Sequence, residues 1–258
     1  MTQTTVKRDQ WVVLPKANAS ASLRLICLPF AGGTSNAFRN WTRYLPDSIE
    51  LCAVELPGRG HRLSETLFRH IDPLIEQTAR GIKSYLNKPF VIFGHSMGAL
   101  TGFELTHHLL KEFALQPIHL FVSGRGAPHL PSREQPIHRL PDAEFVNKIR
   151  NYNGTPKEVI EHDELMDIMK PILRADFQVC ETYEYTNQYA PFNHPITVFG
   201  GLKDSSTTRE DLQAWKQYTH SFFNLRMFPG DHFYLQDSEV QVIETILRDI
   251  SSHFDLRS

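Results

Sequence analysis

A serine between two glycines is the first candidate for chemistry in this chain. Ser96 lies two positions from Gly94 and two from Gly98, within FGHSMGALTGFEL (93–105). An apolar run typical of a strand precedes it and an amphipathic run typical of a helix follows, as in a nucleophile elbow. Side chains two positions away would collide across such a turn, so small residues are needed there. The pattern predicts a nucleophile at Ser96; the alternative is a small residue in a tight turn.

A serine nucleophile needs a general base, and the base needs an orienting acid. His232 follows an expected strand and precedes the last expected helix, where folds with this elbow place the base. Asp204 follows the preceding expected strand, so it is the predicted acid. Asp231 is the competing acid because it adjoins His232. His95 borders the serine, and we expect it to fill space or to form a local hydrogen bond.

An acyl-transfer site also needs donors for the oxyanion. The backbone N–H of Met97, directly after the serine, is one predicted donor. LPFAGGTSNAF (28–38) fits the loop that supplies the other, with the N–H of Ala31 as first choice and Phe30 as second. The alternative is a plain glycine-rich turn. No GK[ST] follows, so the loop is not a phosphate loop.

The elements that must position these residues alternate along the chain. Short apolar runs predict buried strands at 23–28, 49–54, 89–95, 118–124, 195–200 and 222–228. Helical spacing predicts helices at 35–45, 71–87, 97–113, 207–218 and about 236–253. Strands separated by helices with short connections predict a mostly parallel sheet covered on both faces, in a single α/β domain spanning residues 1–258.

One segment, about 126–190, interrupts this alternation. It begins with a loop rich in Pro, Arg and His and continues with helical spacing at 141–152 and 163–185. Asp142 is predicted as the N-cap of the first of these helices. The segment is too long for a simple crossover, so we expect an inserted helical lid over the carboxyl edge of the sheet. The alternative is a second small domain with unrelated work.

Composition excludes several classes of function. The 258 residues carry a net charge of −2, so no overall field favours nucleic acid or an anionic membrane. No apolar run approaches the ~18 residues of a membrane helix, and the polar N-terminus lacks a signal-peptide core. Three scattered cysteines favour the reducing cytoplasm over a disulfide framework. No metal-binding motif such as HExxH is present, so we expect no metal.

Beyond these local patterns, the chain resembles the type II thioesterases, the stand-alone editing enzymes of polyketide and nonribosomal peptide synthesis. The matching motifs are LPFAGG (28–33), ELPGRGHR (55–62), GHSMGAL (94–100), SGRGAPH (123–129), LRADF (173–177), FGGLKD (199–204) and GDHFYL (230–235). They cover nearly all of the chain from about residue 23, in the family's order. Phe30 departs from the family, in which His or Tyr is more usual, and this affects the loop beside the oxyanion site.

The resemblance implies an α/β-hydrolase fold with a mobile lid. It also implies hydrolysis of stalled or wrong acyl groups from the phosphopantetheine arm of carrier proteins. No diffusible cofactor is expected, since phosphopantetheine arrives with the substrate. Spacing alone supports only a serine hydrolase with a lidded pocket, so a carboxylesterase or an acyltransferase with the same triad stays open.

Partners follow from the same resemblance. Because carrier proteins are commonly acidic, a basic rim is one interpretation of the arginines and histidine at 59, 61, 62, 125, 133 and 139, and a solvated surface is the other. A monomer is the expected oligomeric state.

Overall fold

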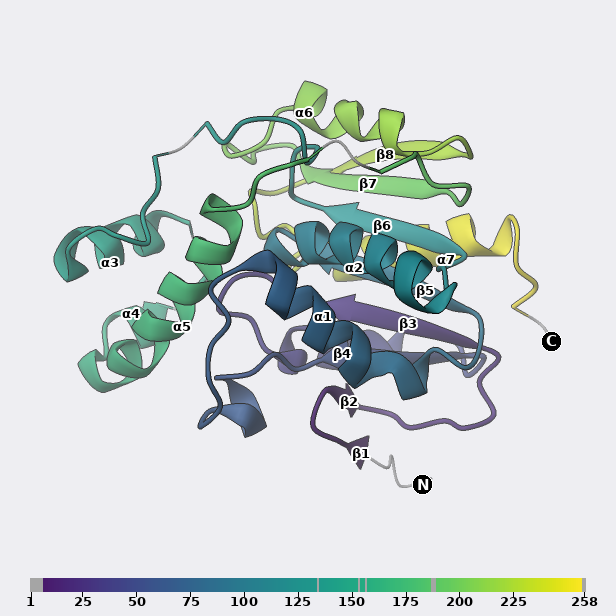
Figure 1. The fold of residues 1–258 in the computed structure, drawn as a ribbon, viewed down its shortest axis with the longest axis horizontal. Coiled ribbons are helices and arrows are strands. Elements are labelled where there is room, and N and C mark those ends of the chain that lie inside the picture. Colours follow the sequence, from purple (N-terminus) through teal and green to yellow (C-terminus); the bar gives the residue numbers. More distant parts are fainter. Residues whose placement is uncertain (1–6, 134, 153, 156, 187–188, 257–258) are drawn as a thin grey trace.

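The eight described strands form one sheet. The computed structural model describes residues 7–133, 135–152, 154–155, 157–186 and 189–256 (Figure 1). The strands are β1 (Lys7–Arg8), β2 (Val12–Leu14), β3 (Leu23–Leu28), β4 (Ile49–Val54), β5 (Phe90–His95), β6 (His119–Ser123), β7 (Ile196–Gly201) and β8 (Phe223–Phe228). Their order across the sheet is β1-β2-β4-β3-β5-β6-β7-β8. All six predicted strands are confirmed.

The strands from β3 to β8 run parallel, whereas β2 is antiparallel to both of its neighbours, β4 and β1. Sequence reasoning missed β1 and β2, because two- and three-residue strands carry too few positions to show a period. The central strands β4, β5, β6 and β7 are buried along their whole length. Burial on both faces explains why they appear in the sequence as continuous apolar runs rather than alternating ones.

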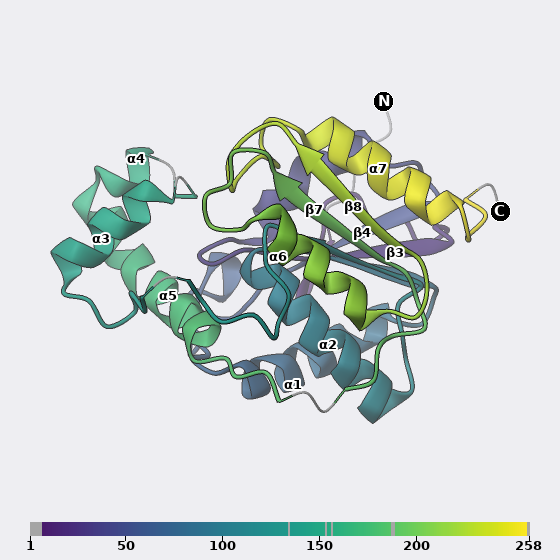
Figure 2. The same cartoon turned by 90° about the horizontal axis from the view of Figure 1, so that it is seen from above.

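Helices cover both faces of the sheet, as predicted. The helices α1 (Ile71–Ile82), α2 (Met97–Phe113) and α6 (Arg209–Gln213) lie on one face, and α7 (Glu239–Ser251) lies on the other (Figure 2). Each face has its own apolar core, and the core beneath α7 also holds Phe38 and Trp41. These two residues belong to Ser35–Arg43, which is a 3₁₀ helix.

The insertion between β6 and β7 projects to one side of the body (Figures 1 and 2). It contains α3 (Asp142–Asn151), α4 (Lys157–Ile160) and α5 (Asp163–Glu181). A small apolar cluster holds α3 to α5, and Val179 near the end of α5 packs into the main core. The predicted N-cap of α3 is wrong: Pro141 occupies that position, and Asp142 instead pairs with Lys170 and Arg174 of α5.

Candidate active site

Ser96 occupies a strained turn between β5 and α2. Its φ is 55° and its ψ −111°, and its N–H donates to the carbonyl of Ser123 at 2.7 Å. A Cβ added at Gly94 would lie 1.9 Å from the Gly98 carbonyl oxygen, and one at Gly98 would lie 2.2 Å from the Leu28 carbonyl oxygen. Both contacts are with backbone, which cannot swing aside. The turn therefore requires glycine on each side of the serine, as the elbow interpretation predicts.

Helix α2 begins at Met97, immediately after the serine. The first N–H groups of a helix have no partner within it and carry its positive dipole end. Among the described residues, no protein atom accepts a hydrogen bond from the Met97 N–H. This donor is thus free to bind an oxygen that becomes negative beside Ser96.

The loop Phe30–Gly33 lies beside this turn. The Gly33 N–H donates to the Phe30 carbonyl at 2.8 Å, and the Gly32 N–H donates to the Asp176 carboxylate at 2.7 Å. These two donors are occupied. Within the described chain no protein acceptor takes the N–H of Ala31 or Phe30, so both predicted candidates keep a free donor.

His232 and Asp204 meet beyond the ends of β8 and β7. His232 Nδ1 lies 2.8 Å from Asp204 Oδ2, and the side chain of Asp204 has no exposed surface. Burial would raise the pKa of this carboxyl, but hydrogen bonds and charge from His232 and Ser206 outweigh burial and lower the pKa to about 2. The competing Asp231 instead accepts the Phe233 N–H at 2.9 Å.

The predicted nucleophile, acid and base converge at one edge of the sheet. β5, β7 and β8 are parallel, so the residues that follow them emerge at the same edge. The ring of His95, the residue before Ser96, lies 5.0 Å from the ring of His232, centroid to centroid. The residue before the predicted nucleophile thus lies beside the predicted base, although 136 positions (232 − 96) separate Ser96 from His232.

His95 is more than a space-filling residue. Its ring is fully buried, its Nδ1 lies 2.8 Å from Ser123 Oγ, and that hydroxyl bonds the Tyr234 hydroxyl. Burial, reinforced by the charge of His232, holds the pKa of His95 well below its usual range. The neutral His95 ring therefore places no second positive charge beside His232. The predicted local hydrogen bond is present, but no sequence pattern indicated that it continues through Ser123 to the Tyr234 hydroxyl.

Aromatic side chains border the site. Phe30 lies edge-on to Phe233, with ring centroids 5.0 Å apart. Phe233 also touches the insertion, because a Cβ added at Gly154 would lie 2.1 Å from its ring. An apolar border beside the nucleophile suits an acyl chain better than a charged group.

Two arginines assigned to a basic rim are instead buried. Arg59 pairs with Asp176 at 2.6 Å and Arg62 pairs with Glu65 at 2.6 Å, and both arginine side chains are almost wholly covered. The rim interpretation is wrong for these two. Arg133 and Arg139 are exposed, although Arg133 pairs with Asp211 at 2.8 Å.

The described residues include no group of three or more His, Cys, Asp and Glu side chains placed to hold a metal ion. In the same part of the chain, no helix has the length and apolar character to span a membrane.

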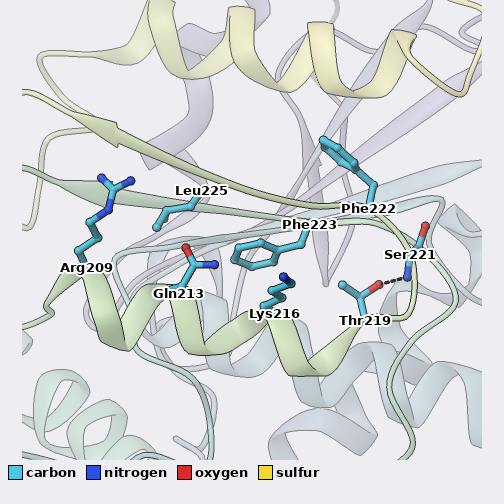
Figure 3. A pocket seen from close by; sticks show the side chains of 8 residues that line it. All are labelled: Arg209, Gln213, Lys216, Thr219, Ser221, Phe222, Phe223 and Leu225. Atoms are coloured by element: carbon cyan, nitrogen blue, oxygen red, sulfur yellow. Dashed lines mark hydrogen bonds between the residues drawn. The ribbon is translucent and has the colours of Figure 1, made fainter.

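An open groove of about 500 Å³ lies between α6 with its 3₁₀ extension Ala214–Tyr218 and the edge strand β8 (Figure 3). It is lined by Arg209, Gln213, Lys216, Thr219, Ser221, Phe222, Phe223 and Leu225. Most of these residues precede β8 or begin it, whereas His232 follows the other end of that strand. The groove is therefore separate from the triad.

Comparisons with known proteins identify one family of relatives for this chain. A family model described as a thioesterase domain matches residues 23–250. The gramicidin S biosynthesis protein GrsT of Aneurinibacillus migulanus is 43% identical over 242 residues, 94% of each chain. The type II thioesterase BorB, from the borrelidin biosynthetic cluster, has a TM-score of 0.87 at 30% identity, covering 95% of this chain and 99% of BorB. RedJ, a thioesterase of the prodiginine pathway in Streptomyces coelicolor, has a TM-score of 0.82 at 37% identity, covering 89% and 86%.

Proposed function

Because the chain belongs to the thioesterase family and is a thioester hydrolase of the serine type with the α/β-hydrolase fold, we propose that it removes acyl groups from carrier proteins. Its substrates are stalled or aberrant acyl chains on the phosphopantetheine arms of a polyketide or nonribosomal peptide synthase. Relatives named for such pathways support this substrate class.

The first half-reaction transfers the acyl group to the enzyme. Ser96 Oγ attacks the thioester carbonyl while His232 Nε2 takes the hydroxyl proton. The N–H groups of Met97 and Ala31 bind the oxyanion, each contributing about 2.7–4 kcal/mol in the transition state. The carbon–sulfur bond then breaks while His232 Nε2 gives its proton to the departing sulfur, and the thiol leaves readily because its pKa is near ~8.5. Pantetheine departs on its carrier, and the acyl group remains on Ser96.

The second half-reaction releases the acid. His232 takes a proton from water, the hydroxide attacks the acyl-serine, and Ser96 leaves with that proton returned. Asp204 accepts a hydrogen bond from the Nδ1–H of His232 at 2.8 Å, which leaves Nε2 free to act as base. The carboxylate stays ionised throughout, because its pKa is about 2. No step requires a metal or diffusible cofactor.

The observation that carries this proposal is the joint geometry of the strained serine turn and the buried His232–Asp204 pair. A carboxylesterase or an acyltransferase would use the same triad. The thioesterase match over residues 23–250 favours thioester hydrolysis over both. We also propose that the protein acts in the cytoplasm as a monomer.

A panel of acyl-loaded carrier proteins, followed by mass spectrometry, tests the reaction. Wild type is expected to release free acid and holo-carrier, and Ser96→Ala to release neither. Hydrolysis that persists in Ser96→Ala overturns the mechanism. Faster turnover of p-nitrophenyl esters than of acyl-carrier would identify a carboxylesterase, and acyl transfer to an added alcohol or amine an acyltransferase.

Carrier docking is tested separately. Arg133 and Arg139 are exposed within the insertion and offer positive charge to an acidic carrier. Reversing both to Glu should raise KM for acyl-carrier while leaving KM for acyl-pantetheine unchanged. Arg150→Glu, an exposed change on α3, is the matched control. Equal effects on both substrates would contradict docking at these residues.

A further inference from the structure

The oxyanion loop is tied to the insertion by one buried carboxylate. Asp176 of α5 accepts the Gly32 N–H at 2.7 Å through Oδ2. Both of its oxygens also face Arg59, with Nη1–Oδ2 at 2.6 Å and Nη2–Oδ1 at 2.8 Å. Asp176 and Arg59 are each 3% exposed. A side chain of the insertion thus reaches the loop expected to supply an oxyanion donor.

The bond to Gly32 fixes the peptide unit next to that donor. Gly32 has a φ of +76°, and the turn is closed by the bond from the Gly33 N–H to the Phe30 carbonyl. The N–H of Gly32 belongs to the peptide unit that joins Gly32 to Ala31. A carboxylate that holds this N–H fixes the plane of that peptide, and so limits the direction of the N–H on Ala31 itself.

Helix α5 lies directly on the loop. A Cβ added at Gly32 would lie 2.6 Å from Leu173 Cδ2. Leu173 precedes Asp176 by three positions, so both side chains project from the same helix face. The apolar contact of Leu173 and the carboxylate of Asp176 therefore both hold the loop at Gly32.

Stability is a weak reason for such a pair. Removing two charges from water is costly, and replacing such a pair with apolar residues of similar volume is often neutral or stabilising. Their bidentate geometry is strongly directional instead. Arg59 comes from the loop after β4, and its Nη1 also reaches the Gly33 carbonyl at 3.4 Å. The pair is thus built into both sides of the turn.

We propose that Asp176, oriented by Arg59, is a positioning residue for the oxyanion loop, which keeps its catalytic shape only while α5 is seated on it. This inference rests on the proposed function, because it concerns the same oxyanion site. Movement of α5 away from the body removes the acceptor from Gly32 and lowers the rate of acylation. Packing of α5 against the loop and formation of the oxyanion site then occur together.

The clean test removes both charges together. Arg59→Met with Asp176→Leu leaves no unpaired buried charge but takes away the acceptor for Gly32. With an acyl-pantetheine thioester as substrate, kcat should fall about 10- to 100-fold. This fall is no larger than the one caused by removing a whole oxyanion donor. KM should change less than about twofold, because the substrate-binding surface is untouched. The inhibition constant of an acyl trifluoromethyl ketone, which forms a tetrahedral oxyanion on serine, should rise by the factor by which kcat/KM falls. An unchanged kcat or inhibition constant overturns the proposal.

A second variant pair keeps the test decisive if the first fails to fold. Arg59→Gln with Asp176→Asn retains shape and a carbonyl acceptor for Gly32, so kcat should stay within about fivefold of wild type. A loss above about tenfold at an unchanged melting temperature would overturn the proposal. Asp142→Asn, which breaks ion pairs inside the insertion without touching the loop, is the matched control and should leave kcat unchanged.

The proposed function fails in a different way. If Ser96→Ala hydrolyses the thioester as fast as wild type, the assigned site is wrong whatever Asp176 does. If Ser96→Ala is inactive and the apolar pair behaves like Asp142→Asn, only the positioning role is wrong.

Discussion

Mild acid should unfold this protein through histidines buried without charge. In the described chain, four buried histidines have pKa values pushed down mainly by burial: His95, His107, His119 and His194. For His107, His119 and His194 the pKa falls to about 3, about 2 and about 4. In the unfolded chain each is expected to titrate near ~6.5.

The sign of the effect follows from proton uptake. Below about pH 6.5 the unfolded chain binds protons at these positions and the folded chain does not, so acid favours unfolding. Between about pH 7.5 and about pH 5, each histidine costs about 2 kcal/mol by linkage, and four together cost about 8 kcal/mol. That approaches the whole stability of an ordinary domain, ~5–15 kcal/mol. We therefore expect a steep loss of stability near pH 5.

Urea unfolding at the two pH values measures the difference directly. His107→Phe tests the origin, because the ring stacks on Tyr189 and Phe192 and a phenyl ring can take that place. The pH-dependent loss should shrink by about 2 kcal/mol in this variant. The matched control is His220→Gln, an exposed side chain, and it should keep the wild-type difference. A wild-type difference below about 2 kcal/mol, or no change in His107→Phe, would refute the reasoning.

Three further predictions concern the site. Asp204→Asn should lower kcat about 10³- to 10⁴-fold with little change in KM in steady-state hydrolysis, because the amide no longer holds the base in the right tautomer; a tenfold loss or less would contradict that role. Gly94→Ala should destabilise the fold by about 3 kcal/mol or more in thermal unfolding, because its Cβ meets backbone at 1.9 Å. Gly126→Ala, whose Cβ meets a side chain at 3.2 Å, should differ little from wild type. Gly154→Ala should displace the Phe233 ring, 2.1 Å from the new Cβ, and change the ratio of kcat/KM between short and long acyl thioesters; an unchanged ratio would show that this ring does not set chain length.

Much of the fold can be predicted from the sequence, because buried parallel strands appear in it as short apolar runs. The run 23–28 and strand β3 have the same bounds, and so do 49–54 and β4. The strands in turn predicted where the chain reaches the carboxyl edge, and hence Asp204 and His232. The local patterns agree with the global fold, so position relative to the strands is enough to choose His232 as the base from 13 histidines.

Two of the wrong predictions concern arginines that are buried against a carboxylate. Arg59 and Arg62 were interpreted as surface residues, since arginine is rarely buried. Their partners, 117 and 3 positions away, cannot be found from composition. Asp176 did leave a sign: it shares a helix face with Leu173 and Val179, and both are buried. A carboxylate on an apolar face requires a buried partner, and that rule would have marked it.

The placement of the insertion between β6 and β7 also affects how the protein is made. Ser96 and its turn belong to the part of the chain synthesised before the insertion, whereas Asp204 and His232 come after it. At ribosomal rates the delay between Ser96 and His232 is on the order of ten seconds. During that time the growing chain carries the predicted nucleophile without its predicted base. Hydrolysis by this triad can therefore begin only after β7 and β8 have completed the sheet.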